Sequence, residues 1–570
     1  MSNSESSIPT LGLPFHGGLR NPGSSIHGAN IAIMEALEMI VRHSEFPRIR
    51  IFVAPGQSNG PVEGWLGRIR PLARSGAEGL VVEKSATLPH RGLGRLDAWH
   101  STTGRTTRGI HVRSVTGGRF PVTGVHHSFA SNKELHDWVL RLLLDDVRPY
   151  DSQVAASRAS QAATRRSIRH VQRALQRQLG TPLPFGGRVD RLPLGVDTQR
   201  FVPRDKAQVR YDLGLPIDEL LVSSIGRISA AGKADLVPMI DAFASIVRRS
   251  ERRVRLVLCG VDTEGYTDTL RAHARALGIV DRVWFQGTVP PAERHLWHAA
   301  ADVFVSPADS MQETFGLTCI EAMACGVPQV VSDWNGYRDT VVEGVTGYRA
   351  PTTWIDADRD VGLMAAAGEW ALDHFALAQS VVVDMDVFRE RLSDLIEDAD
   401  LRRRMGEASR ARAVEHYEWS HIVSRYDALW LELGAIARTT AHGRRRGGQY
   451  LISRYVDTFR GNATRMITKD SRIVLSERGH RVVEGEEGLP QYFTRGFTLD
   501  YGLIEDALVS LGRRGKSIGQ IAASIASERS VHPDRVVRHV VWLLKYDLAR
   551  LVGSAKSKSK PKPRYTLKPM

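Results

Sequence analysis

The sequence has few cysteines and no long apolar run. Its three cysteines, Cys259, Cys319 and Cys325, form no CxxC pair and are odd in number, so a disulfide scaffold and a cysteine zinc cluster are excluded. No window approaches 18 uninterrupted apolar residues, and the start, MSNSESSIPTLGLPF, lacks the basic residues and apolar core of a secretory signal. We therefore expect a soluble protein of the reducing cytoplasm, or one peripheral to the inner membrane face.

The composition is that of a folded protein with several domains. At about 150 residues per domain, 570 residues predict three to four domains. A hydrophobic fraction of 42% and a charged fraction of 25% suffice to bury a core, which excludes wholesale disorder. Lysine and arginine exceed aspartate and glutamate by 77 − 63 = 14, so we expect an anionic partner: a nucleotide phosphate, an acidic membrane or a nucleic acid.

Short β-branched runs alternate with helical patterns along most of the chain. From about residue 220 the expected strands are LLVSSIG, VRLVLCG, VWFQG, VFVSP and PQVVSD, with a first helix over 233–249. This rhythm is typical of a parallel, doubly wound α/β sheet. The first two hundred residues repeat it less cleanly, in RIRIFVAP, GLVVEK, FPVTGVHH, SQVAASRA and DRLPLGV. Two such sheets that face each other form a cleft lined by the loops after their strands.

The last part of the chain differs from the rest. A helical block ends at about Leu433, and the glycine-arginine stretch HGRRRGGQ that follows is typical of a linker. Beyond it, Ile518, Ile521 and Ile525 share one helical face and Pro533 opens a further helix, which predicts a small helix-turn-helix or winged-helix unit. The final stretch, GSAKSKSKPKPRYTLKPM, has too little apolar content to fold alone, so we predict a disordered basic tail.

Two loops carry the residues with the clearest chemistry. Glu313 and Glu321 lie eight apart, and they bracket residues 315–318, whose N–H groups fall at a helix amino terminus that favours phosphate. Arg227 and Lys233 follow an earlier strand, six residues apart, so both can reach one diphosphate. Such a pair stabilises the charge that develops on a departing nucleoside diphosphate, although isolated cations in loops are mostly solvated.

These residues, together with EAMACGVP, GVTGYRAP and LPLGVDTQRF, resemble the retaining GT-B glycosyltransferases of family 4, over about residues 10 to 435. The resemblance implies two facing Rossmann-like domains: an acceptor-side domain over 1–205 and a nucleotide-sugar-binding domain over 206–418, with a helix that crosses back over 419–436. Beyond it we expect a basic linker over 437–470, a small, mostly helical, winged-helix-like module over 471–552 and the tail over 553–570.

The resemblance also implies an activity and a set of roles. The enzyme would move a sugar from a nucleoside-diphosphate sugar to an acceptor hydroxyl with retention, by front-face transfer in which the departing phosphate helps to deprotonate the acceptor. Glu313 would hydrogen-bond the donor sugar, Glu321 would bind the ribose, and the backbone of Gly316, Leu317 and Thr318 would meet phosphate and sugar. The acceptor, a glycan, lipid or polypeptide, is left open.

Members of the family also carry a histidine at the end of an amino-domain strand, facing the reacting sugar. His127 matches that position better by its distance from Pro121, and His126 stays an alternative because neighbouring strand residues point to opposite faces.

The amino-terminal phosphate loop departs from the family pattern, because an insert separates Gly17 and Gly18 from the helix that opens at Gly28. Either site gives the backbone the freedom that a close approach to phosphate needs, and we favour Gly28 slightly because it abuts the helix.

We expect no metal and no cofactor besides the donor. The D-x-D strings 384–386 and 356–358 follow no convincing strand end in the cleft, and Arg227 and Lys233 can neutralise the diphosphate themselves. Cys319 and Cys325 are interpreted as small core residues.

Alternatives remain within and outside this class. A sugar-nucleotide epimerase or a pyridoxal-dependent phosphorylase uses similar facing sheets, but the latter needs a Schiff-base lysine that we cannot identify. In the C-terminal module, Arg535 and Arg538 make a sparse footprint for nucleic acid, so we expect none and favour a grip on a polypeptide or another subunit.

A membrane surface is a further possible partner. The segment TRRSIRHVQRALQRQLG sets arginines against apolar residues on a basic amphipathic helix, which fits either anionic lipid or a solvated helix packed on its own sheet. The arginines are Arg165, Arg166, Arg169, Arg173 and Arg177, and the apolar residues are Ile168, Val171, Leu175 and Leu179.

Overall fold

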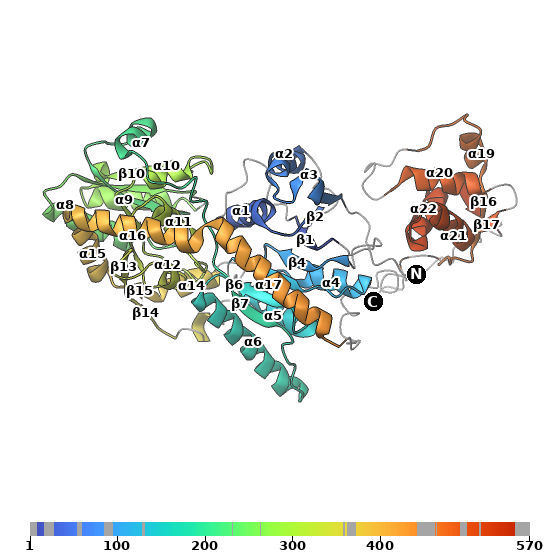
Figure 1. Ribbon diagram of the computed structural model, residues 1–570, viewed down its shortest axis with the longest axis horizontal. Coiled ribbons are helices and arrows are strands. Elements are labelled where there is room, and N and C mark those ends of the chain that lie inside the picture. The colour runs from blue at the N-terminus through green and yellow to red at the C-terminus, as the bar shows by residue number, and fades with distance from the viewer. Residues whose placement is uncertain are drawn as a thin grey trace, which may run out of the picture. The chain divides into compact units, whose positions relative to one another are not determined.

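The chain forms two compact units, one mostly within residues 1–451 and the other mostly within residues 452–570 (Figure 1). The computed structural model describes residues 8–15, 28–53, 60–84, 95–127, 132–230, 232–262, 264–356, 359–361, 372–441, 462, 464, 466–490, 499–511 and 515–552. The predicted tail and most of the predicted linker lie outside the described residues.

The amino-terminal lobe of the first unit is built on a seven-stranded sheet in the order β3-β2-β1-β4-β5-β6-β7, and the pairs from β2 through β7 are parallel. The strands are β1 (Thr10–Pro14), β2 (Arg48–Val53), β3 (Leu80–Lys84), β4 (Ala98–Ser101), β5 (Val122–Val125), β6 (Ser152–Ala155) and β7 (Arg188–Arg191). The helices are α1 (Gly28–His43), α2 (Gly60–Ile69), α3 (Gly76–Gly79), α4 (Thr107–Thr116), α5 (Asn132–Leu144) and α6 (Arg158–Leu179). Its central strands are buried, as expected of a parallel sheet with helices on both faces.

The second lobe carries a six-stranded parallel sheet in the order β10-β9-β8-β11-β12-β13. Its strands are β8 (Leu220–Ile225), β9 (Val254–Cys259), β10 (Val283–Gly287), β11 (Val303–Ser306), β12 (Gln329–Ser332) and β13 (Gly347–Ala350). Its helices are α7 (Lys206–Leu213), α8 (Val237–Arg249), α9 (Tyr266–Ala276), α10 (Arg294–Ala299), α11 (Leu317–Ala324) and α12 (Tyr337–Thr340). The strand order reverses between β8 and β11, and such a switch point opens a crevice beyond the carboxyl ends of the strands.

After β13 the chain adds a two-stranded antiparallel sheet and then helices that return to the first lobe. These elements are β14 (Thr352–Trp354), α14 (Leu372–Gln379), β15 (Val381–Val383), α15 (Met385–Glu397), α16 (Ala399–Tyr417) and α17 (Trp419–Thr439). In Figure 1, α16 and α17 run along the first unit, one after the other. The indole N–H of Trp430 donates to Thr123 Oγ1 at 2.9 Å, and Ser44 Oγ donates to Asp427 at 2.7 Å, so α17 is anchored in the amino-terminal lobe.

The second unit has its own hydrophobic core and a three-stranded antiparallel sheet in the order β17-β16-β18. Its elements are β16 (Arg472–Leu475), α19 (Glu477–Val483), α20 (Tyr501–Ser510), β17 (Lys516–Ser517), α21 (Ile518–Glu528), α22 (Pro533–Lys545) and β18 (Ala549–Leu551). Ile518, Ile521 and Ile525 are all buried, which confirms the helical face predicted from their spacing. Pro533 opens α22, as predicted. The winged-helix interpretation stays a prediction.

The predicted α/β fold of two doubly wound sheets is confirmed, with differences at particular elements. Strands β1, β4 and β13 escaped prediction. The helix expected from Lys233 begins only at Val237, because the N–H groups of Lys233 and Ala234 both turn back to the Ser229 carbonyl. The strand expected in DRLPLGV lies earlier, at Arg188–Arg191, since proline at position 193 cannot donate to a ladder. Within the described ranges, no helix has the length and apolarity that spanning a membrane requires.

Candidate functional site

The loop after β8 holds Arg227 and Lys233 close to the end of the sheet. The N–H of Gly226 donates to the Cys259 carbonyl at 2.9 Å, and a Cβ on Gly260 would lie 1.5 Å from the Gly226 carbonyl oxygen. The loop therefore packs against the end of β9 at a distance that glycine alone allows. Arg227 Nη2 donates to the Gly232 carbonyl at 2.9 Å, which closes the loop on itself.

Lys233 and Glu313 come together at the carboxyl ends of β8 and β11, although 80 residues separate them. Lys233 Nζ donates to Glu313 Oε2, and the two side chains are 18% and 12% exposed. The Tyr337 hydroxyl lies 3.4 Å from Lys233 Nζ and also from Glu313 Oε2, and it shares a hydrogen bond of 2.7 Å with Ser306. A cation and a carboxylate are thus held together, largely out of water, by four different elements of the lobe.

Helix α11 begins beside this pair, on a turn that requires glycine. Gly316 has φ +95°, and a Cβ there would lie 2.4 Å from the Tyr337 ring. The N–H groups of Leu317 and Thr318 fall in the first helical turn, where they have no intrahelical acceptor and favour an anion. Thr318 Oγ1 is buried with no hydrogen-bond partner in the described part of the chain.

Glu321 does not join the first glutamate; it lies in a separate buried cluster. Arg294 Nη2 donates to Glu321 Oε1, and His298 Nε2 donates to Glu321 Oε2 at 3.1 Å. Burial raises the pKa of Glu321, but Arg294 and His298 outweigh burial and hold the pKa below its usual value. Sequence reasoning missed Arg294 and His298, although their i,i+4 spacing on α10 places them on one helical face.

The two adjacent histidines after β5 have different surroundings. His126 Nε2 lies 3.1 Å from Thr164 Oγ1, and burial, with the neighbouring His127, lowers its pKa to about 3. His127 Nε2 donates to the Thr102 carbonyl at 2.8 Å, which leaves Nδ1 as a lone-pair acceptor with no partner among the residues described. Burial also lowers the pKa of His127. Thr314 Oγ1 donates to the His127 carbonyl at 2.7 Å, so His127 adjoins the Glu313 loop.

The remaining predicted positions divide into those the structure describes and those it does not. Gly28 is the first residue of α1, as expected, whereas Gly17 and Gly18 lie outside the described residues. Asp384 caps α15 by accepting the N–H groups of Asp386 and Val387, which explains one D-x-D string as a helix start. All three cysteines are buried, and burial raises their pKa values, as expected of core residues.

The described ranges contain no group of three or more histidine, cysteine, aspartate or glutamate side chains arranged to hold a metal ion. The polar groups that do converge are the cation, the carboxylate and the helix start described above. Such a set suits a phosphate-bearing ligand.

The fold has relatives of known structure. Sucrose-phosphate synthase from Thermosynechococcus elongatus is 18% identical with a TM-score of 0.50, and the match covers 75% of this chain and 100% of that one. The Anabaena protein HepE in complex with UDP and glucose is 17% identical with a TM-score of 0.50, over 74% of this chain and 100% of that one. At such identities the likeness concerns the fold alone, and it defines a two-lobed GT-B protein.

Sequence relatives narrow the class. Residues 205–361 match the family described as glycosyl transferases group 1. "D-inositol 3-phosphate glycosyltransferase 2" of Catenulispora acidiphila is 34% identical over 231 residues, which are 37% of this chain and 52% of that protein. A "GDP-mannose-dependent alpha-(1-6)-phosphatidylinositol monomannoside mannosyltransferase" of Mycolicibacterium smegmatis is 32% identical, over 33% of this chain and 52% of that protein.

The chain spans about half the length of these two curated relatives. The match over residues 205–361, together with these relatives, confirms the resemblance of its motifs to the glycosyl transferases of group 1.

Proposed function

We propose that this protein is a retaining glycosyltransferase that moves a sugar from a nucleoside-diphosphate sugar to an acceptor hydroxyl without a metal ion. The observation that carries the proposal is the contact between Lys233 and Glu313 beside the start of α11. A sugar nucleotide needs cations at its diphosphate and a hydrogen-bond acceptor at its sugar. Lys233 and Glu313 are two such groups, and they are hydrogen-bonded to each other. The match of residues 205–361 to the glycosyl transferases of group 1 agrees with this activity.

In the proposed complex, Lys233 and Arg227 bind the diphosphate, together with the N–H groups of residues 316–318. Glu313 is then released from Lys233 and accepts hydrogen bonds from hydroxyl groups of the donor sugar. Glu321 binds the ribose while it stays anchored to Arg294 and His298. On the amino-terminal side, Gly28, or Gly17 and Gly18, lets the backbone approach the phosphates.

The proposed reaction is a front-face transfer. The bond between the anomeric carbon and the phosphate oxygen breaks while the acceptor oxygen attacks from the same side, and the acceptor proton passes to the departing phosphate. Lys233 and Arg227 stabilise the charge on that phosphate, which is the task that a metal ion performs elsewhere. His127 is neutral, and its Nδ1 accepts a hydrogen bond from the sugar or the acceptor.

The names of the relatives indicate which nucleotides and acceptors to test first. One relative is named as GDP-mannose-dependent, and one structural neighbour binds UDP, so we propose UDP and GDP sugars as the first donors to test. Several relatives are named for D-inositol 3-phosphate, which makes phosphorylated cyclitols the first acceptors to test, before other glycans, lipids and polypeptides.

Donor hydrolysis tests the proposal without knowledge of the acceptor. Wild type is screened against UDP and GDP sugars, next to Glu313→Gln, to Arg227→Ala combined with Lys233→Ala, and to Glu251→Gln, an exposed control. We expect both site variants to lose at least about 100-fold in rate and the control to match wild type. Release of a free epimer would favour an epimerase, and unchanged site variants would contradict the proposed site.

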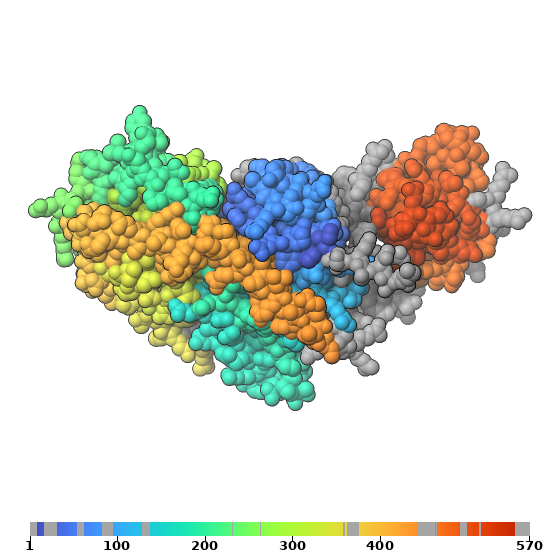
Figure 2. All heavy atoms as spheres, viewed as in Figure 1, coloured from blue at the N-terminus to red at the C-terminus, as the bar shows by residue number. Residues whose placement is uncertain are grey.

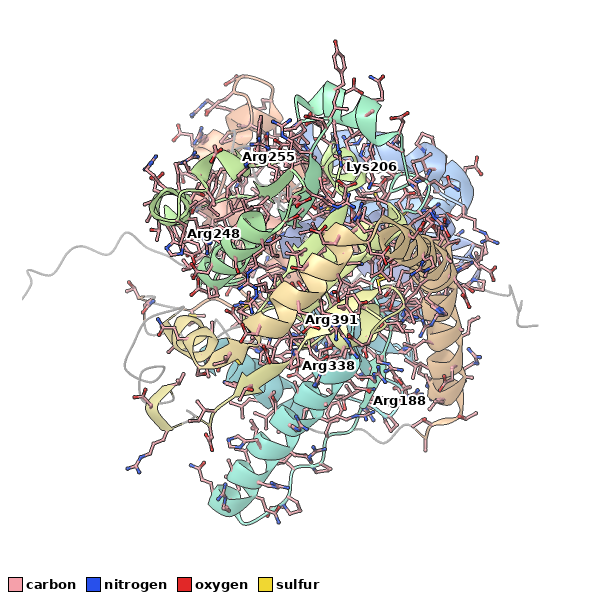
Figure 3. The ribbon with its side chains drawn as sticks, turned by 90° about the vertical axis from the view of Figure 1, so that its left-hand side faces the viewer. Arg188, Lys206, Arg248, Arg255, Arg338 and Arg391 are labelled. Carbon is pink, nitrogen blue, oxygen red and sulfur yellow. The ribbon has the colours of Figure 1, made fainter. Side chains whose placement is uncertain are left out.

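The surface of α6 is the part that we propose for contact with an anionic membrane. Five exposed arginines line it, and none forms an ion pair with a carboxylate of the described chain. In contrast, five of the six basic residues labelled in Figure 3 are paired: Arg188 with Asp190, Lys206 with Asp302, Arg255 with Glu219, Arg338 with Asp333 and Arg391 with Asp394. Figure 2 shows α6 protruding from the first unit.

This contact would be mainly electrostatic, because Ile168 and Val171 are buried in the core beneath α6 and Leu179 alone of its four apolar residues is exposed. Sedimentation with vesicles of anionic phospholipid at low salt tests it. Wild type should co-sediment, and Arg169→Gln combined with Arg173→Gln should weaken binding at least about fivefold. Absence of wild-type binding at low salt would contradict the proposal.

The second unit is proposed to bind a polypeptide or another subunit rather than nucleic acid. Val536 and Val540 of α22 face its own core, and Arg535 pairs with Asp500 at 3.2 Å, so α22 offers little free positive charge to a phosphate backbone. A labelled DNA duplex should show no salt-dependent shift with the full chain beyond that of a chain ending at residue 441. A shift specific to the full chain would favour nucleic acid.

A further inference from the structure

Four ionisable side chains meet where α1 of the amino-terminal lobe lies against α10 and α11 of the other lobe. Arg294 Nη2 contacts Glu321 Oε1 and lies 3.3 Å from Glu35 Oε1, so one guanidinium nitrogen serves two carboxylates. His298 completes the cluster on the other oxygen of Glu321. The exposed fractions are 25% for Glu35, 10% for Arg294 and 1% for Glu321, so the cluster is largely shielded from water and Glu35 is the most exposed of these three.

The cluster is unequally divided between the lobes. Arg294, Glu321 and His298 all belong to the second lobe, and their bonds do not depend on the amino-terminal lobe. Glu35 is the member that comes from the other lobe. One turn before it, Ala32 is buried in a hydrophobic cluster formed mainly by the second lobe. The bond between Glu35 and Arg294 therefore exists only when α1 packs against that lobe, which we call the seated state.

In the seated state, the Glu35 carboxylate joins that of Glu321 beside the Arg294 guanidinium. Burial raises the pKa of Glu35 to about 7; Arg294 and Arg200 oppose the rise, and Glu321 and Glu38 add to it. The seated state therefore holds a proton on Glu35 that the unseated state, with an ordinary pKa of 4.5, releases over the window between about 4.5 and 7. Protonation of Glu35 therefore stabilises the seated state as pH falls through 7, and this stabilisation is lost as pH rises.

We propose that Arg294 is a positioning residue that couples the orientation of Glu321 to the packing of α1 against the second lobe. Within its own lobe Arg294 orients Glu321, and it takes Glu35 as a second partner when the lobes come together. A donor ribose that shares Glu321 would leave more of the guanidinium to Glu35 and so strengthen the bond between the lobes. That last step rests on the proposed function, whereas the coupling between the lobes does not.

The coupling is measured by fluorescence energy transfer on the full chain without ligand. Dyes are placed on Gln176→Cys in α6 and Thr269→Cys in α9, which are exposed positions on different lobes, whereas all three native cysteines are buried. For pKa values of about 7 seated and 4.5 unseated, the ratio of seated to unseated molecules should rise about thirtyfold from pH 8 to pH 5.5.

Variants of the cluster separate the coupling from a general effect of pH. Glu35→Gln copies the protonated carboxyl, so at both pH values it should match wild type at pH 5.5. Arg294→Met leaves Glu35 and Glu321 without their cation, so the seated fraction should fall at pH 8 and recover at pH 5.5. Glu251→Gln, an exposed residue of the other lobe that is not among the charges acting on Glu35, should follow wild type.

A wild-type distribution that does not change with pH, or a Glu35→Gln variant that matches wild type at pH 8, would overturn the proposal. The proposed function fails separately. If the protein hydrolyses no sugar nucleotide but its fluorescence energy transfer depends on pH, the coupling is supported and the proposed activity is contradicted. If the protein is active but its fluorescence energy transfer does not depend on pH, the activity is supported and the coupling is contradicted.

Discussion

Replacing Lys233 by methionine keeps most of the side-chain volume and removes the charge that contacts Glu313. An exposed ion pair contributes about 0.2–1 kcal/mol, and breaking a fully buried pair costs about 3–5 kcal/mol. Exposures of 18% and 12% place this pair nearer the buried limit. The Tyr337 hydroxyl, 3.4 Å from Glu313 Oε2, remains as a partner and reduces the cost. We therefore expect a coupling of about 2 kcal/mol between the two residues.

The coupling is measured by urea unfolding of Lys233→Met, Glu313→Gln and the double variant, as a double-mutant cycle. Donor hydrolysis of the same proteins should fall about 10²–10³-fold for Lys233→Met, because the leaving diphosphate loses a cation. Lys206→Met is the matched control, since Lys206 pairs with Asp302 outside the candidate site. A Lys233→Met enzyme within about twofold of wild type would refute the reasoning, whatever its stability.

Two further predictions concern the helix start and the histidines. Gly316→Ala should destabilise the protein by about 2–4 kcal/mol in thermal unfolding, because the new Cβ would lie 2.4 Å from the Tyr337 ring. The control Gly214→Ala, with φ +67° and open space around it, should cost only about 1 kcal/mol. Equal costs for the two variants would contradict the contact with Tyr337. His127→Gln should lower kcat at least about tenfold with little loss of stability, and His126→Gln should mainly lower stability; the reverse pattern would assign the cleft to His126. Because burial keeps the pKa of His127 below 6.5, a plot of kcat against pH should show no loss from its protonation above that pH, and a decline between pH 8 and 7 that His127→Gln abolishes would contradict this.

The sequence predicts the second lobe better than the amino-terminal one for physical reasons. Strands β8, β9 and β11 are rich in valine and other apolar residues, and each is followed by glycine or proline, so their pattern is clear. Strand β4 (Ala98–Ser101) has the sequence AWHS, which contains no β-branched residue, so its pattern does not mark it. Strand β1 is short and carries Gly12, where a Cβ would lie 2.9 Å from Leu96, and such close approach is invisible in one sequence.

The candidate site shows the same division. The loops that carry Lys233 and Glu313 could be identified because each follows a clear strand and contains polar residues at a helix start or turn. That Lys233 contacts Glu313 could not be predicted, because it depends on the order in which the strands join the sheet. The partners of Glu321 were missed for a similar reason: Arg294 and His298 lie in a helix whose composition suggests only an ordinary surface.

The central claim, that cations and a helix start hold a diphosphate, is tested most directly by calorimetric titration of UDP and GDP into wild type and Lys233→Met. The account predicts that the preferred diphosphate binds wild type with a Kd at least about tenfold lower than that of the Lys233→Met protein, and that uridine or guanosine alone binds both equally weakly. Equal affinity of the two proteins for both diphosphates would contradict it.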